Sequence, residues 1–71
     1  MNANKLKGRM VEAGYSQRTL AAAAKMSENS LGNKINGKSS FTLDEATKIC
    51  SILSITDPLE KAAIFLGEAS Q

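Results

Sequence analysis

Helix-capping residues divide this chain into short segments, and they constrain its fold more than any other feature. Ser16 and Ser27 each precede a run of apolar residues with helical spacing, and serine oxygens at such positions cap helix N-termini. Thr42 opens the sequence Thr-Leu-Asp-Glu, which is the pattern of a capping box. Asp57 precedes Pro58, a residue favoured at the first position of a helix. The chain is therefore expected to form several short helices.

The apolar residues between these caps predict five helices. We expect them at residues 4–13, 17–24, 28–35, 43–53 and 58–66. Gly14 and Gly37 follow the first and third helices, where a helix commonly ends at glycine. No segment alternates apolar and polar residues as a strand does. The sequence thus predicts an all-α fold, a compact bundle of five short helices in one domain over residues 1–71.

The residue types present exclude several kinds of chemistry. The chain has 71 residues with no histidine and a single cysteine, Cys50, so an internal disulfide, a thiolate zinc cluster and imidazole acid–base catalysis are ruled out. The acids Glu12, Asp44 and Glu60 are interpreted as surface and helix-start residues, not as a catalytic pair. We expect no enzyme activity, no cofactor, no metal and no small-molecule ligand. Cys50 shares a stripe with Ala46 and is assigned to the core.

Charge is unevenly distributed along the chain. Residues 1–38 carry seven basic and two acidic residues, a net charge of +5, whereas residues 39–71 carry two basic and five acidic residues, a net charge of −3. This asymmetry indicates one face for a polyanion, although a solvated surface of uneven charge fits the composition equally well. The longest apolar run, residues 20–24, is far too short to span a membrane. We expect no membrane contact, and a free cysteine favours a cytoplasmic location.

The second and third predicted helices carry the functional signal. They are two short helices with a brief break between them, and the third has a polar face opposite Leu31 and Ile35. An α-helix fits the DNA major groove, where asparagine can pair with adenine and glutamate can accept from the cytosine amino group. The residues expected on this exposed face are Glu28, Asn29, Gly32 and Asn33.

Three sequence runs resemble the helix-turn-helix of the phage repressor and Cro family, the Xre-like regulators. They are SQRTLA at residues 16–21, MSENSL at 26–31 and INGK at 35–38, and the resemblance extends over about residues 3–55. It implies a lambda repressor-like DNA-binding domain with its helix-turn-helix at residues 17–35. The implied function is a sequence-specific transcriptional regulator, a phage or prophage Cro-type repressor, that binds double-stranded operator DNA through the third helix.

The resemblance also assigns roles to individual residues. A small residue in the second helix, here Ala21, lets the two helices cross closely. The expected base contacts are Glu28, Asn29, Ser30 and Asn33. The expected phosphate contacts are Gln17, Arg18, Lys34, Asn36, Lys38, Ser39 and Ser40, with backbone amides of the exit loop contributing.

Two positions depart from the family pattern. Lys25 stands in the turn where glycine is common, so either this lysine adopts a left-handed conformation or the turn differs. Gly32 lies inside the third helix at a cost of about 1 kcal/mol against alanine. It either permits a close approach to the backbone, or the helix is partly ordered only on DNA.

Plainer interpretations remain open for several of these residues. Glu28 also stabilises the helix dipole, and Asn29 and Asn33 can be solvated polar positions. Lys5, Lys7 and Arg9 are interpreted as a solvated face from which one residue could reach DNA. As an alternative function, the helical domain is a protein-interaction module, for example an antitoxin that neutralises a partner.

A dimer is expected because one short helix reads too few base pairs to locate an operator in a genome. Related regulators bind as two-fold dimers to palindromic sites. The expected surface is the last helix, residues 58–66, whose apolar side chains cover more than half of its circumference. Otherwise this helix packs over the first and fourth helices of a monomer. The candidate contacts are Leu59, Ala62, Ile64, Phe65 and Leu66.

Overall fold

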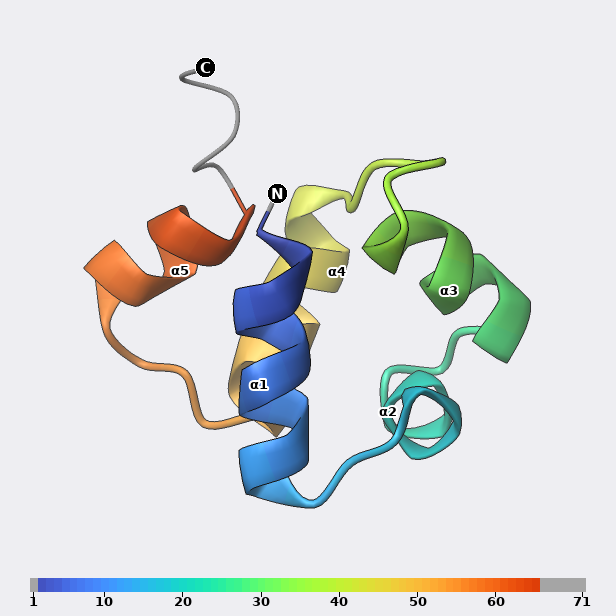
Figure 1. The fold of residues 1–71 in the computed structure, drawn as a ribbon, viewed down its shortest axis with the longest axis horizontal. Coiled ribbons are helices and arrows are strands. Elements are labelled where there is room, and N and C mark those ends of the chain that lie inside the picture. The colour runs from blue at the N-terminus through green and yellow to red at the C-terminus, as the bar shows by residue number, and fades with distance from the viewer. Residues whose placement is uncertain (1, 66–71) are drawn as a thin grey trace.

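The computed structural model of the chain describes residues 2–65, and every regular element in that range is a helix (Figure 1). Five are present there: α1 (Ala3–Ala13), α2 (Gln17–Ala23), α3 (Glu28–Ile35), α4 (Leu43–Ile52) and α5 (Pro58–Phe65). The described part contains no strand, which confirms the all-α prediction. The expected helix limits agree with the observed ones to within one residue over the described range. The predicted end of the last helix at Leu66 lies outside the described residues.

The predicted caps form as side-chain hydrogen bonds to free amides of the first helical turn. Ser16 Oγ accepts from the Thr19 amide at 3.1 Å, and Ser27 Oγ accepts from the Ser30 amide at 3.0 Å. At the start of α4, Thr42 Oγ1 accepts from the Glu45 amide at 3.1 Å, while Glu45 Oε1 accepts from the Thr42 amide at 2.9 Å. These bonds satisfy donors that a helix start leaves unpaired, so the helix limits are set locally.

The core is aliphatic and draws on all five helices and on the segment before α5. Cys50 is buried within it, as expected. Alanine at position 21 is also buried, where α2 and α3 pack together. The largest fully buried side chains are Leu6, Leu20, Leu31, Ile49, Ile55 and Ile64.

Figure 1 shows α1 in front of α4, with α5 on one side of this pair and α2 and α3 on the other. The chain turns from α2 into α3 through residues 24–27, where Lys25 has φ 59°. The first of the two alternatives for this turn is therefore correct, and lysine takes the left-handed conformation. At the other side, the Asn2 amide donates to the Ile64 carbonyl at 2.7 Å, and Arg9 Nε lies 3.2 Å from Glu60 Oε2. These contacts hold α5 against α1.

Candidate nucleic-acid interface

The outward face of α3 is polar along its length. Glu28 and Asn29 are exposed, Ser30 and Asn33 are half-buried, and the helix begins at the Ser27 cap. Leu31 and Ile35 are buried against the core on the opposite side. The four residues expected to read bases therefore have at least part of their side chains accessible. Glu28 stands in the first turn, where a carboxylate also stabilises the helix dipole.

Gly32 is buried, which corrects its expected place on the exposed face. The side chain of Gln17, at the first position of α2, crosses this glycine and donates from Nε2 to the Glu28 carbonyl at 3.3 Å. A Cβ atom built on Gly32 would lie 2.6 Å from that same Nε2 atom. Glycine here thus permits a close approach between α2 and α3. Gln17 itself is half-buried, with its amide fixed beside the start of α3.

The loop from α3 to α4 covers residues 36–42 and begins with exposed polar residues. The amides of Lys38 and Ser39 donate to the Asn33 carbonyl at 2.8 and 3.3 Å, and the Gly37 amide donates to the Lys34 carbonyl at 3.2 Å. These amides complete the C-terminal end of α3, which corrects the expectation that they are available to phosphates. Four side chains of the loop lie at exposed positions and remain accessible to a partner: Asn36, Lys38, Ser39 and Ser40.

Lys34 does not point away from the molecule as a phosphate contact would. Its Nζ lies 3.1 Å from Glu45 Oε1 and donates to the Ser40 carbonyl at 3.0 Å, and its side chain is only 13% exposed. The ammonium of Lys34 is thus already paired within the protein, and the phosphate role expected for it stays a prediction. The amide of Thr42 and, after it, the side chain of Lys34 hold the pKa of the Glu45 carboxyl below its usual value.

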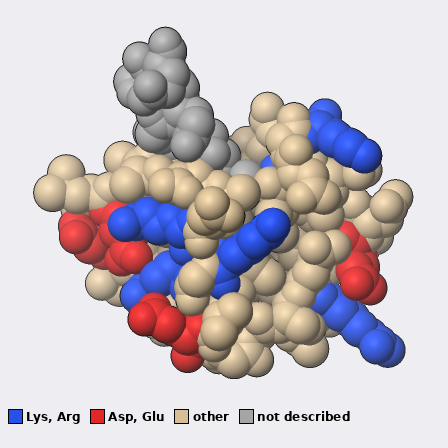
Figure 2. Space-filling model, in the orientation of Figure 1, with Lys and Arg blue, Asp and Glu red and all other residues tan. Residues whose placement is uncertain are grey.

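The basic residues of α1 differ in availability. Lys5 and Lys7 are exposed, whereas Arg9 is paired with Glu12 at 3.1 Å and with Glu60 at 3.2 Å. In Figure 2 the lysine and arginine side chains over α1 lie among acidic ones. More lie at the side of the molecule where Figure 1 places α2, α3 and the loop after them. On the visible face, positive charge is therefore spread among acidic residues and forms no single patch.

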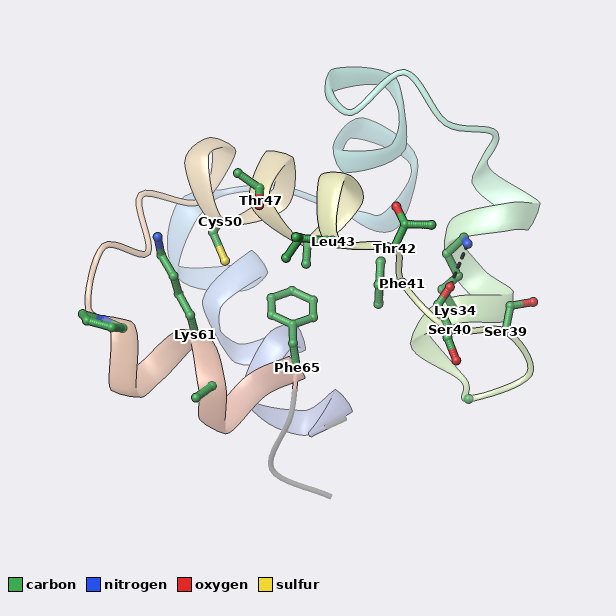
Figure 3. A pocket seen from close by; sticks show the side chains of 14 residues that line it. Lys34, Ser39, Ser40, Phe41, Thr42, Leu43, Thr47, Cys50, Lys61 and Phe65 are labelled. Atoms are coloured by element: carbon green, nitrogen blue, oxygen red, sulfur yellow. Dashed lines mark hydrogen bonds between the residues drawn. The ribbon is translucent and has the colours of Figure 1, made fainter. Parts of the chain in front are cut away.

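A groove of about 630 Å³ lies between the α3–α4 loop, α4 and α5 (Figure 3). The rings of Phe41 and Phe65 meet there edge to face, with centroids 5.4 Å apart and planes at 86°. Cys50 borders the groove, and burial raises the pKa of its thiol. Leu43 stands at the groove with 84% of its surface exposed. Phe41 is the one apolar residue in an otherwise polar loop, which is a local sign of this groove, but its partner Phe65 is distant in the chain.

Other site types have little support over residues 2–65. That range holds no group of three or more acidic, cysteine or histidine residues arranged to bind a metal ion. Its helices are too short or too polar for any of them to cross a membrane.

Residues 1–67 match the family described as "Protein of unknown function (DUF739)", and the chain belongs to that family. No curated protein and no solved structure matches the chain.

Proposed function

For this member of the DUF739 family, we propose a role as a small sequence-specific regulator that binds double-stranded DNA through α3. The observation that carries the proposal is the accessible polar face of α3. It is continuous with Gln17 at the start of α2 and with the exposed loop that follows α3. Helices of this size enter the major groove with the side chains of their first turns toward the bases. The residues proposed to contact bases are Glu28, Asn29, Ser30 and Asn33.

The proposed phosphate contacts flank this face. They come from α2 and from side chains of the α3–α4 loop, since several amides of the loop are used within α3. We retain Gln17, Arg18, Asn36, Lys38, Ser39 and Ser40 in this group. Within this proposal, α2, the turn at Lys25 and α3 form a helix-turn-helix at residues 17–35, and the protein acts as a Cro-type repressor in the cytoplasm, where it occupies an operator.

A homodimer belongs to the same proposal, but its surface differs from the one expected. Ile64 is fully buried and is therefore removed from the list of candidate contact residues, and Leu66 lies outside the described residues. Leu59 and Leu43 are 79% and 84% exposed, and Leu43 stands beside the groove. A two-fold contact needs a self-complementary patch, and a projecting leucine next to an apolar groove supplies both parts. The protein measures 30 × 24 × 20 Å, and half-sites one DNA turn apart are separated by about 34 Å.

Fluorescence anisotropy with a random-sequence duplex tests DNA binding directly. Affinity should fall as salt rises, because phosphate contacts release counterions. Lys38→Ala should reduce the salt slope by about one unit, whereas Lys48→Ala, at an exposed position on α4, should leave it unchanged. If the wild-type protein binds no duplex even at low salt, DNA binding is refuted.

Base reading requires a selected site. After selection from a random DNA pool, Asn29→Ala or Asn33→Ala should cost about 1–3 kcal/mol on the selected site and little on random DNA. Equal losses on both would reassign these residues to the phosphate backbone.

Sedimentation of the protein with its selected duplex tests the dimer. Two protomers per palindromic site are expected, and Leu43→Ser should weaken the assembly while Val11→Ser, at a similarly exposed residue of α1, should not. One protomer per duplex at saturation would refute the dimer.

The alternative function, a protein-interaction module such as an antitoxin, draws support from the groove with its two phenylalanines. Absence of any salt-dependent binding to duplex DNA would favour this alternative.

A further inference from the structure

One pair of oppositely charged side chains holds the second half of the α3–α4 loop against α3 and α4. Lys34, on the last turn of α3, reaches Glu45 on α4. It also reaches the carbonyl of Ser40 in the loop, a contact that Figure 3 draws as a dashed line. The same Glu45 oxygen also accepts from the amide of Thr42, where the loop enters α4. Two charged side chains thus join α3, the loop and α4 through contacts of 2.9–3.1 Å.

The environment of this pair makes it more than a chance surface contact. The side chains of Lys34 and Glu45 are 13% and 25% exposed, so water and salt screen their attraction less than on an open surface. Holding a lysine in one conformation costs side-chain entropy, which the hydrogen bond to Ser40 and the ion pair offset. By contrast, Lys38 lies at an exposed position four residues further along.

We propose that Lys34 and Glu45 are positioning residues that hold the α3–α4 loop so that the side chains of Lys38, Ser39 and Ser40 can contact phosphates. Lys34 acts through the loop and does not itself neutralise a phosphate. The inference rests on the proposed DNA binding, since it assigns a function to the conformation of a loop in that interface.

For removal of the Glu45 carboxylate, this proposal predicts a change in DNA affinity opposite to the one that net charge alone predicts. Removing a carboxylate near a DNA-binding surface strengthens DNA binding if only net charge matters. If Glu45 instead holds the loop, Glu45→Gln should weaken DNA binding by about three- to tenfold, which corresponds to the loss of one well-placed contact. Lys34→Met should weaken it by a similar factor.

The salt dependence separates positioning from direct contact. Each phosphate contact contributes a little under one unit to the slope of log affinity against log salt. Lys38→Ala should lower both the affinity and this slope. In a Lys38→Ala background, Lys34→Met should lower the affinity further without changing the slope, because the charged contact that Lys34 positions is already absent, whereas a direct phosphate contact by Lys34 would lower the slope by about one further unit. The double variant Lys34→Met/Glu45→Gln should bind no more weakly than either single variant, because both remove the same pair. Lys34→Arg should restore most of the affinity, since arginine keeps the charge and the donors.

Hydrogen exchange followed by NMR tests the loop without DNA. Lys34→Met should speed exchange of the Thr42 amide relative to amides inside α2, while Lys48→Met should leave both unchanged. If wild-type protein binds no DNA, the proposed function and the role toward phosphates are refuted, yet faster exchange would still show that the pair holds the loop. Tighter DNA binding by Glu45→Gln, or a lower salt slope for Lys34→Met/Lys38→Ala than for Lys38→Ala alone, would overturn the positioning role.

Discussion

Gly32→Ala is expected to leave the free energy of unfolding nearly unchanged, although alanine is the better helix former. Alanine in place of glycine inside a helix stabilises by about 1 kcal/mol. At Gly32, however, the new Cβ would lie 2.6 Å from Gln17 Nε2, so the glutamine side chain must move. That movement breaks its hydrogen bond to the Glu28 carbonyl, a loss of about 0.5–1.5 kcal/mol. The two effects cancel to within about 0.5 kcal/mol.

Gly8 in α1 offers a matched control, because a Cβ built there meets no atom within 4 Å. Gly8→Ala should therefore keep the whole gain of about 1 kcal/mol and raise Tm by about 4–8 °C. In a Gln17→Ala background the obstacle at Gly32 is absent, and Gly32→Ala should recover the same gain. Urea unfolding followed by circular dichroism at 222 nm measures all of these variants. Equal stabilisation by Gly8→Ala and Gly32→Ala in the wild-type background would refute the reasoning.

Two further predictions concern the turn and the ion pair. Lys25→Gly should raise the free energy of unfolding by up to about 1 kcal/mol, because glycine removes the cost of φ 59° at lysine, and a lower Tm would contradict this. In carboxyl NMR titrations, the pKa of Glu45 should lie below its usual value and rise in Lys34→Met, because the lysine helps to lower it. Since the folded pKa is depressed, the stability that Glu45 contributes is present above its unfolded pKa and lost as pH falls through the folded pKa. Glu45→Gln should remove that part of the acid sensitivity, and an unchanged stability–pH curve would count against the pair.

The sequence alone determined the helices, because their limits depend on interactions between residues three or four positions apart. Ser16, Ser27 and Thr42 cap amides within their own helical turn, and such bonds need no distant partner. The apolar stripes that face the core also follow from helical periodicity within each segment. For this reason Leu31 and Ile35 were assigned to the core correctly. The polar residues of α3 could be selected for the same reason.

Tertiary structure decided what depends on two elements meeting. Periodicity placed Gly32 on the outer face of α3, and only the packing of α2 against α3 covers it with Gln17. Lys34 looked like a free basic residue, because nothing in the local sequence reveals that Glu45 will lie 3.1 Å away. The burial of Ile64 depends on α5 folding back onto α1, since adjacent apolar residues leave the inward direction of a short helix ambiguous. Local patterns fix the helices, whereas the partners of their side chains are set by contacts between segments distant in the chain.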